Sequence, residues 1–464
     1  MIPISIENIC KWTMGEIIQR GRFDSISNIT IDSRKAIKGS LFIPLSGEKY
    51  DGHTFIPHAA GNGCRIALIQ KDVVLPEALP EDMSLIKVSN CLESLQNIAK
   101  GYRDLFSVPV IAVTGSNGKT TTKDMVAGVL GVKYNVLKNK GNYNNHIGLP
   151  LTLFELNETH ECMVLEMGMS GLGEIELLSS IAKPDIAFIT NIGWAHIEKL
   201  GSKEMIAKAK LEIVSGLKED STLVINGDDE YLCKKTAQLT AEYHLTKVGT
   251  LPGNNLRAVE VTDQRGSGFT FKTNLTADKV FMVNHPGRHH IISALFAVWA
   301  GRHFNMNHDE VYRGLLQFEP SGMRMEHITS KERLFINDAY NANPDSMKAA
   351  IEYLKQLPSK KRIVVLGDML ELGKFAETCH RDLANNIIDA EIDDVVLVGS
   401  LTSFTADELM VKGYPSSHIF HAKNIMHASS LLHQITGQGD TVLVKGSRSM
   451  GMERIIQHFM EGEN

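Results

Sequence analysis

The sequence of 464 residues has few of the features that mark secreted, membrane-spanning or nucleic-acid-binding proteins. Its six cysteines are scattered without a Cys-x-x-Cys pair, which indicates reduced thiols rather than disulfides. The formal net charge of -6 provides no basic surplus for nucleic-acid phosphates, so no nucleic-acid partner is expected. No apolar run approaches the roughly 18 residues that cross a bilayer, and residues 1–7 lack the basic and apolar stretches of a signal peptide. We therefore expect a cytoplasmic protein without membrane insertion, and we expect a monomer.

The composition that is present is that of an ordinary globular protein, with 43% hydrophobic and 22% charged residues. The length suggests about three domains. Residues 1–106 mix short strands with turns, whereas residues 107–318 alternate strands with helices, which predicts a parallel sheet covered on both faces. Within this region, residues 242–285 resemble a small antiparallel addition. Residues 319–464 begin at a linker, because Pro320 and Gly322 interrupt any regular secondary structure there. The alternation of strands and helices then resumes, which predicts a second doubly wound domain.

The predicted fold class is therefore α/β. Strands are expected at residues 110–113, 163–166, 186–190, 222–225, 334–337, 362–366, 394–398, 418–421 and 441–445. Helices are expected at residues 91–105, 119–131, 173–182, 203–217 and 289–302.

Residues 110–121 carry the most specific motif of the chain. A β-branched run ends at a glycine-rich turn and a helical pattern begins at Lys119, so backbone N–H groups and a helix N-terminus point to one place that suits a polyphosphate. Lys119 would place its charge on the outer phosphates, and the Thr120 hydroxyl would hold Mg²⁺. The alternative is an ordinary strand-to-helix turn with a solvated Lys119. The spacing Gly-x-x-Gly-Lys-Thr is shorter than the general P-loop pattern, so it does not by itself indicate a kinase or a GTPase. The predicted nucleotide-binding residues are Thr114, Gly115, Ser116, Asn117, Gly118, Lys119, Thr120 and Thr121.

Two polar residues at strand ends are candidates for binding the same Mg²⁺. Glu166 ends one apolar strand of the central region, and His196 follows the next one. Each residue alone is also explained by a turn, an ion pair or a structural role. Their shared placement with Thr120, on the side where the glycine-rich turn opens, favours the metal site.

Lys210 interrupts the apolar stripe of the helix expected at residues 203–217. It lies four residues after Ile206 and three before Ile213, so it shares their face, whereas Lys208 does not. A lysine at such a position either extends its ammonium group to solvent or is buried. Burial would lower its pKa and make the neutral amine available for reaction. The spacing leaves both alternatives open.

Polar clusters also follow three expected strands of the last region, at residues 338–343, 367–368 and 445–448. Ligands of doubly wound domains gather at the carboxyl ends of the strands.

Together these features resemble the Mur ligases, the ATP-dependent amide-forming enzymes of peptidoglycan synthesis, over essentially the whole chain. The resemblance implies a three-domain architecture: an N-terminal UDP-substrate domain at 1–106, a central P-loop parallel-sheet domain at 107–318, and a C-terminal Rossmann-like domain at 319–464 that binds the amino donor. Glu166 and His196 match the metal-ligand positions of the family, and Lys210 matches its carbamylated lysine near a second Mg²⁺. Arg324 matches the linker arginine that reaches the ATP phosphates.

The resemblance also implies how the nucleotide base and ribose are held. Asp338 matches the acid that contacts the ribose, and Asn341 lies in the same segment. The family usually has Gly-x-His-Asn-x-x-Asn at the helix beside the adenine, and this chain departs from that pattern. His290 and Ser293 replace the two asparagines. His290 can still donate and accept hydrogen bonds, so it remains an expected ATP-binding residue, but the base contacts are open.

The ends of the chain resemble the family member that joins D-alanyl-D-alanine to UDP-MurNAc-tripeptide through an acyl phosphate, with ATP and Mg²⁺. Alternatives are a Mur-type or folylpolyglutamate-synthase-like ligase with another amino donor, or a P-loop ATPase without ligase activity. The third residue of the tripeptide, lysine or diaminopimelate, is left open. Lys445 and Arg448 are expected to hold the dipeptide carboxylate, although both are also explained as solvated charges. The substrate-binding residues implied are Ser33, Arg34, Gly47, Asn144, Asn145, Lys445, Ser447 and Arg448.

Overall fold

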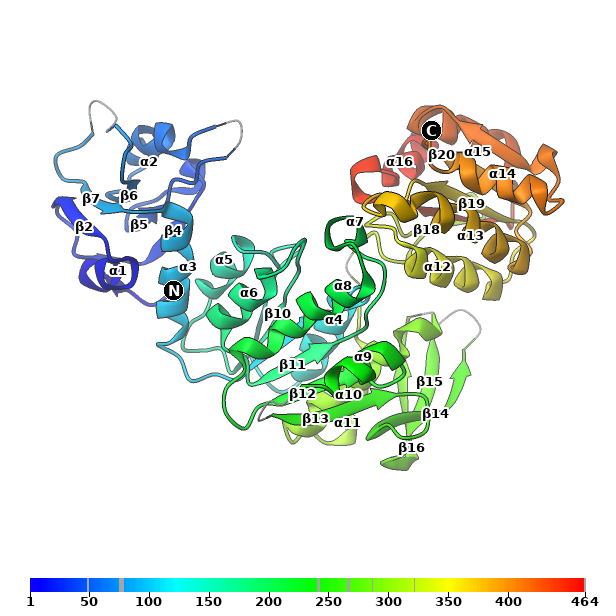
Figure 1. The fold of residues 1–464 in the computed structure, drawn as a ribbon, viewed down its shortest axis with the longest axis horizontal. Coiled ribbons are helices and arrows are strands. Elements are labelled where there is room, and N and C mark those ends of the chain that lie inside the picture. Colours follow the sequence, from blue (N-terminus) through cyan, green and yellow to red (C-terminus); the bar gives the residue numbers. More distant parts are fainter. Residues whose placement is uncertain are drawn as a thin grey trace.

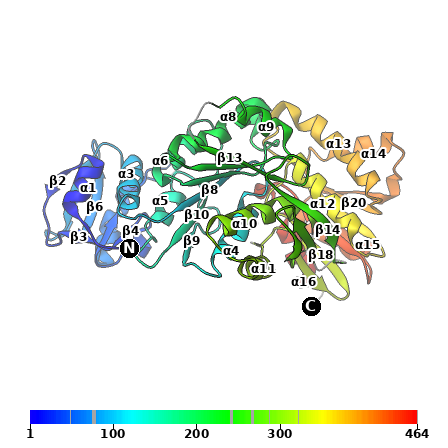
Figure 2. The ribbon, with the colours of Figure 1, turned by 90° about the horizontal axis from the view of Figure 1, so that it is seen from below.

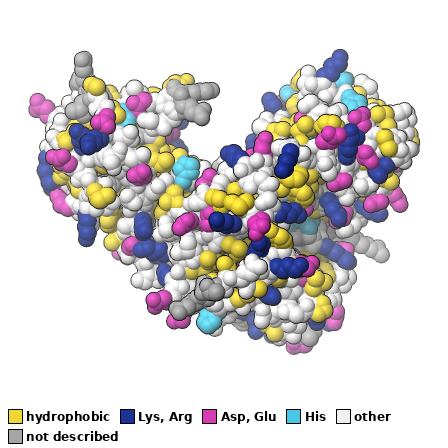
Figure 3. All heavy atoms as spheres, viewed as in Figure 1, with side chains coloured by type: hydrophobic (Ala, Val, Ile, Leu, Met, Phe, Trp, Pro, Cys, Tyr) yellow, Lys and Arg dark blue, Asp and Glu magenta, His cyan; other side chains and the backbone are white. Residues whose placement is uncertain are grey.

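The computed structural model describes residues 1–47, 50–74, 79–239, 243–264, 268–285, 287–320 and 322–462. Three groups of elements follow one another along the chain, and the central group joins the two outer ones in an open arc (Figure 1). Figure 3 shows the hollow between the two outer groups on this face. All six cysteines are free, as the sequence predicts. Within the described part of the chain, no helix combines the length and the apolar character needed to cross a bilayer.

The N-terminal group is a five-stranded sheet with short helices. The strand order is β2 (Glu16–Gln19), β7 (Ser84–Val88), β6 (Ile66–Gln70), β5 (Ser40–Phe42) and β4 (Asn28–Thr30), and β1 (Ile4–Ser5) pairs with β3 (Ser25–Ile26). Its helices are α1 (Ile6–Thr13), α2 (Ile56–Gly61) and α3 (Cys91–Arg103). The α3 helix begins where the Asn90 side chain accepts hydrogen bonds from the next turn. It packs against α5 (Gly148–Leu153) and α6 (Glu174–Ala182), which attaches this group to the central one (Figure 2).

The central group is built on one nine-stranded sheet within the described residues. Its order is β16 (Thr276–Val283), β15 (Phe269–Thr273), β14 (Leu256–Asp263), β13 (His244–Gly249), β12 (Thr222–Asn226), β11 (Ile186–Ile189), β8 (Val110–Thr114), β10 (Cys162–Glu166) and β9 (Val136–Lys138). Strands β9 to β14 pair in parallel, whereas β14, β15 and β16 pair antiparallel. The expected separate addition at 242–285 is therefore corrected: its first two strands continue the parallel sheet, and only its hairpins are antiparallel.

Helices cover both faces of this sheet, as the alternation predicts. Successive residues of β8 belong to opposite cores: Ile111 and Val113 pack with α4 (Lys119–Leu130), α10 (Ile291–His303) and α11 (His308–Leu316), whereas Val110 and Ala112 pack on the other face. That other face carries α5, α6 and α8 (Lys203–Leu211). The helix expected at 203–217 is shorter than predicted, because it tightens into a 3₁₀ turn over Glu212–Gly216.

The C-terminal group is a six-stranded doubly wound sheet. Its order is β17 (Glu326–Ser330), β18 (Arg333–Asn337), β22 (Thr441–Lys445), β19 (Arg362–Gly367), β20 (Asp394–Val398) and β21 (Ile419–Ala422), and only β17 is antiparallel to its neighbour. Helices α12 (Pro344–Gln356) and α13 (Ala376–Asp389) pack on one face, and α15 (Ile425–Ile435) and α16 (Glu453–Gly462) pack on the other. The α14 helix (Ser403–Val411) lies beside α13. The carboxyl ends of β18, β19 and β22 therefore face the central group.

Candidate active site

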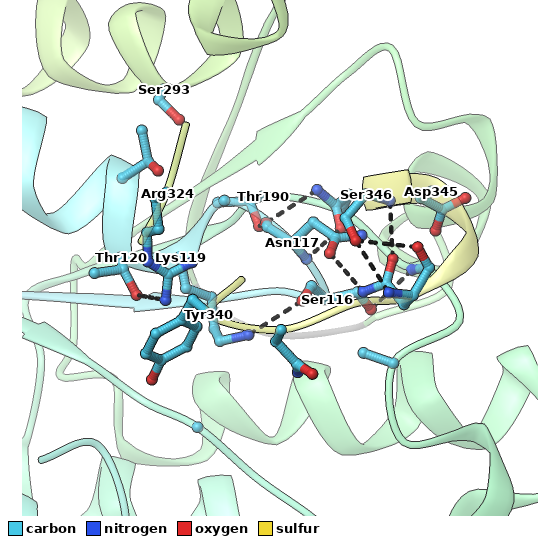
Figure 4. Close-up of a pocket in the computed structure, with 18 of the residues that line it drawn as sticks. Ser116, Asn117, Lys119, Thr120, Thr190, Ser293, Arg324, Tyr340, Asp345 and Ser346 are labelled. Atoms are coloured by element: carbon cyan, nitrogen blue, oxygen red, sulfur yellow. Dashed lines mark hydrogen bonds between the residues drawn. The ribbon is translucent and has the colours of Figure 1, made fainter. Parts of the chain in front are cut away.

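The main cavity has a volume of about 770 Å³ and lies where the central and C-terminal groups meet. The central sheet contributes the loops after β8, β10 and β11, and the C-terminal group contributes the segments around Arg324, Asp338 and Lys445. Figure 4 shows side chains from both groups facing one another across this space. The cavity is therefore open to a ligand that contacts both groups at once.

The glycine-rich loop after β8 is held by the neighbouring strand end. The backbone N–H groups of Ser116 and Asn117 donate to the carbonyl and the side chain of Asn191 at 3.0 and 2.9 Å. The Thr190 hydroxyl donates to the Asn117 carbonyl at 2.6 Å. Gly115 has a φ of 148°, and a Cβ there would lie 1.8 Å from the Thr190 hydroxyl oxygen, so no other residue fits. The loop is thus fixed before a ligand arrives.

The cations around this loop are arranged for an anion. The Lys119 ammonium donates to the carbonyls of Gly115 and Ser116 at 2.8 and 3.2 Å, and burial lowers the Lys119 pKa. Arg324 donates to the Thr120 hydroxyl at 3.1 Å, and its guanidinium lies 3.9 Å from the centre of the Tyr340 ring (Figure 4). Its Nε is buried, and no acceptor among the described residues reaches it. An oxyanion in the cavity would satisfy that donor.

Thr120 and Glu166 form an oxygen-rich corner beside the loop. One oxygen of the buried Glu166 carboxylate accepts from the Thr120 hydroxyl at 2.7 Å, and the other accepts from Asn144 at 2.7 Å. Hydroxyl and carboxylate oxygens are the protein ligands that Mg²⁺ prefers. Among the described residues, no three His, Cys, Asp or Glu side chains lie close enough to hold a metal unaided. The corner therefore fits an ion that takes its remaining ligands from phosphate oxygens and water.

His196 lies at the edge of the same cavity and contacts the C-terminal group. It has a φ of 65° at the start of α7 (Ile197–Leu200), and its Nδ1 lies 2.7 Å from a carboxylate oxygen of Glu371. This hydrogen bond lowers the Glu371 pKa below its usual value. The structure thus brings His196, Thr120 and Glu166 to one cavity, as the shared strand-end placement predicts.

Lys210 is 1% exposed, so the buried alternative is the one observed. Burial, followed by the charge of Lys119, lowers the Lys210 pKa well below its usual value. The side chain is not among those that line the cavity. A neutral amine in this position can react with CO₂.

The residues that the family resemblance places near the adenine form a histidine-rich corner of the cavity. His290 is 6% exposed, burial lowers its pKa well below the usual value, and its Nε2 has no hydrogen-bond partner among the described residues. The ring of His289 lies 4.0 Å from that of His290. Ser293 lines the cavity, but its hydroxyl is already 2.9 Å from the Thr122 hydroxyl. Of the two departures from the family pattern, only His290 therefore presents an unpaired polar atom.

Lys445 and Arg448, which we expect at the dipeptide carboxylate, have different partners in the structure. The buried Lys445 ammonium contacts the Asp338 carboxylate at 2.5 Å and donates to the Asn341 carbonyl at 2.9 Å. Arg448 is half exposed, does not line the cavity, and pairs with Glu453 at 3.0 Å. Lys445 is the last residue of β22, whereas Arg448 begins the 3₁₀ turn Arg448–Met450. Lys445 holds the Asp338 segment, and the half-exposed Arg448 lies outside the residues that line the cavity.

Ser447, Asn144 and Asn145 also form hydrogen bonds within the protein. The Ser447 hydroxyl accepts from the Leu370 backbone at 2.8 Å and so joins the loops after β22 and β19. Asn144 and Asn145 both line the cavity. The Asn145 side chain accepts from the backbone of Gly148, the first residue of α5, at 2.8 Å.

The other expected substrate residues lie in the N-terminal group, away from this cavity. The buried Ser33 hydroxyl is 3.0 Å from His58 Nδ1, and the Gly47 backbone donates to the Tyr50 carbonyl at 2.9 Å. Arg34 is 81% exposed and forms a two-bond pair with Asp32, which lowers the Asp32 pKa to about 2. The two groups of substrate residues therefore lie on different parts of the arc, which suits an elongated substrate (Figure 1).

Asn343 and Glu371 make contacts in the site that the sequence patterns do not predict. Asn343 caps α12, and its side chain donates to Asn117 of the phosphate loop at 2.7 Å, across the two groups. The Asn-Pro pair at 343–344 is a helix-start signal that could have located this cap. Glu371 lies in the loop after β19, and nothing in its local sequence pairs it with His196.

The comparisons with known proteins agree with this geometry. Three family models match: "Mur ligase family, catalytic domain" at residues 25–103, "Mur ligase middle domain" at 113–301, and "Mur ligase, glutamate ligase domain" at 323–448. The UDP-N-acetylmuramoyl-tripeptide–D-alanyl-D-alanine ligase of Bacillus subtilis strain 168 is 40% identical over 465 residues, covering 99% of each chain. The protein of the same name from Escherichia coli K12 is 31% identical over 465 residues, again covering 99% of each chain.

Solved structures are similar over the same length. A crystal structure of MurF from Acinetobacter baumannii is 28% identical, covers 99% of each chain and has a TM-score of 0.89. MurF from Thermotoga maritima, solved in complex with ADP, is 26% identical, covers 94% of this chain and 97% of that one, and has a TM-score of 0.82. These findings confirm the α/β fold with three-domain Mur ligase architecture and a nucleotide-binding role. The chain belongs to the Mur ligase family of ATP-dependent ligases.

Proposed function

We propose that this protein joins D-alanyl-D-alanine to UDP-N-acetylmuramoyl-tripeptide in the cytoplasmic synthesis of peptidoglycan precursors. The full-length similarity to the Bacillus subtilis ligase of that name carries the proposal. The cavity between the central and C-terminal groups supports it, because phosphate-binding and donor-side residues meet there. We further propose that the protein acts as a monomer whose residues 1–106, 107–318 and 319–464 bind the UDP-substrate, ATP and the amino donor.

The reaction has two steps. A carboxylate oxygen of the tripeptide attacks the γ-phosphorus of ATP, the bond to the bridging oxygen of ADP breaks, and an acyl phosphate forms. The amine of D-alanyl-D-alanine then attacks the acyl carbon, loses a proton, and releases phosphate as the amide forms. Phosphoryl transfer depends mainly on positioning and on neutralising charge. Lys119 and the unpaired Nε of Arg324 lie beside the fixed loop and can supply this charge.

Mg²⁺ would supply further charge neutralisation on the phosphates. Thr120 and Glu166 provide oxygen donors for it, and His196 lies at the edge of the same cavity. We propose that Lys210 adds to this set as a carbamate. Its burial and lowered pKa support the reaction of its amine with CO₂.

The remaining substrate residues are proposed by position. Ser33, Arg34 and Gly47 would bind the UDP end, and Asn144 and Asn145 would bind the muramoyl end. Asp338 and Asn341 lie on the nucleotide side, where Lys445 holds them in place. We propose that Arg448 and Ser447 bind the donor dipeptide.

A coupled phosphate-release assay tests the function. Purified protein with ATP and Mg²⁺ is given UDP-muramoyl tripeptides ending in lysine or diaminopimelate, with and without D-alanyl-D-alanine. We expect sustained phosphate release only when nucleotide, tripeptide and dipeptide are all present. Release that ignores the dipeptide would indicate an ATPase, and release supported by glutamate or a single amino acid would indicate another ligase of the same fold.

A further inference from the structure

The His196 ring is held by a residue from the other side of the cavity. His196 belongs to the central group, at the start of α7, whereas Glu371 lies between β19 and the 3₁₀ turn Gly373–Phe375 of the C-terminal group. The Nδ1 of His196 and a carboxylate oxygen of Glu371 are 2.7 Å apart. Both residues have a positive φ, 65° and 62°, so each backbone is bent where the two side chains meet.

Neighbouring contacts hold α7 and the 3₁₀ turn Gly373–Phe375 in a fixed relative position. The Glu198 backbone N–H donates to the Glu371 carbonyl at 3.0 Å. The rings of Trp194 and Phe375 meet edge to face at 5.5 Å between their centres. A Cβ on Gly373 would lie 3.1 Å from the Glu198 side chain, so α7 and the 3₁₀ turn pack closely. These contacts form a junction between α7 and the 3₁₀ turn, and this junction positions the carboxylate of Glu371 beside His196.

The hydrogen bond determines which nitrogen of the ring can act as a ligand. A carboxylate oxygen is only an acceptor, so in the neutral imidazole this contact selects the tautomer with the proton on Nδ1 and the lone pair on Nε2. A histidine that binds a metal through one nitrogen typically donates from the other to a carboxylate or a carbonyl. His196 lines the cavity that contains Thr120 and Glu166. The pair therefore has the arrangement of a ligand histidine and its orienting carboxylate.

We propose that Glu371 is a positioning residue that orients His196 toward a divalent cation, so that docking of the C-terminal group completes the metal site. This inference rests on the proposed function, which places a cation beside Thr120 and Glu166. Glu371 does not touch the cation or the substrates. Because coupling between two equilibria is reciprocal, cation binding also stabilises the docked arrangement of the two groups.

The competing explanation is an ordinary ion pair at a junction. Glu371 is partly exposed, and exposed pairs contribute little to stability, so a purely structural role would leave cation affinity unchanged. Glu198 offers a matched control. It is an exposed carboxylate in the same junction, and its backbone makes the contact with Glu371, so Glu198→Ala removes a similar charge without removing that hydrogen bond.

The test measures Mn²⁺ binding to full-length protein by electron paramagnetic resonance, with a non-hydrolysable ATP analogue present. We expect Glu371→Ala to raise the Mn²⁺ dissociation constant about tenfold or more, the usual loss when a partner of a ligand histidine is removed. Glu371→Gln, whose carbonyl oxygen still accepts from Nδ1, should recover part of the affinity. Glu198→Ala should bind Mn²⁺ like the wild type. Circular dichroism confirms that each variant is folded.

Two results would overturn the proposal: wild-type Mn²⁺ affinity in folded Glu371→Ala, or an equal loss in Glu198→Ala, which would assign the effect to the junction as a whole. Neither readout requires ligation. If wild-type protein binds Mn²⁺ with the nucleotide but fails to join the dipeptide, the proposed function fails while this inference stands.

Discussion

Replacing Lys119 by alanine should nearly abolish ligation without unfolding the protein. Within the described part of the chain, the ammonium donates to the carbonyls of Gly115 and Ser116 at 2.8 and 3.2 Å, so its loss removes two loop hydrogen bonds. Each such bond contributes about 1 kcal/mol to stability. In the reaction the same ammonium faces the charge that develops on the transferred phosphoryl group. Removing one partner of a buried, hydrogen-bonded charge pair costs about 2–5 kcal/mol.

At about 1.4 kcal/mol per tenfold, that cost corresponds to a loss of roughly 30-fold to several thousandfold in kcat/KM. The assay is phosphate release with all three substrates, and thermal unfolding by circular dichroism checks the fold. Lys133→Ala is the matched control, because Lys133 lies just beyond the other end of α4 and donates to the Asn305 carbonyl in an exposed place. Near-normal turnover in a folded Lys119→Ala variant would refute the assignment of the phosphate loop.

Four further substitutions, at three residues, test other parts of the site. Lys210→Ala should lose activity, with partial recovery by short-chain carboxylic acids but none by bicarbonate. Recovery with bicarbonate alone would contradict the carbamate. In protein kept free of CO₂, where the Lys210 amine is unmodified, Lys210→Met should raise the melting temperature near pH 7. Because the Lys210 pKa is lowered in the folded protein, the unfolded chain binds more protons than the folded chain between that pKa and the usual value of 10.5. The wild type therefore gains stability as pH rises toward 10.5, and the melting-temperature advantage of Lys210→Met should shrink. A gain that grows with pH would contradict this sign. Gly115→Ala should lower stability by about 1–3 kcal/mol because its Cβ would meet the Thr190 hydroxyl at 1.8 Å, and an unchanged melting temperature would contradict the close approach. Arg448→Ala should raise the dipeptide KM up to about fivefold, since its guanidinium is half exposed, and leave the ATP KM unchanged; the reverse pattern would place Arg448 on the nucleotide.

The sequence alone determines the elements that depend on local patterns. The strand, glycine turn and helix around Lys119 follow from β-branched residues, two glycines and a helix start within twelve positions, and the structure has them at Val110–Thr114 and Lys119–Leu130. The burial of Lys210 was one of two alternatives from helical spacing, and the packing of α8 selected it. The parallel sheets follow from the alternation of strands and helices. These predictions succeed because neighbours in the sequence are neighbours in space.

The tertiary structure alone decides which distant side chains meet. Arg324 reaches Thr120 across 204 positions, and Asn343 reaches Asn117 across 226. Lys445 and Arg448 are close in sequence, yet Lys445 pairs with Asp338 and Arg448 pairs with Glu453. His196 finds Glu371 only because two separate sheets dock along the cavity. Such pairings depend on the order of the strands and on how whole groups of elements dock. A local sequence pattern contains neither kind of information.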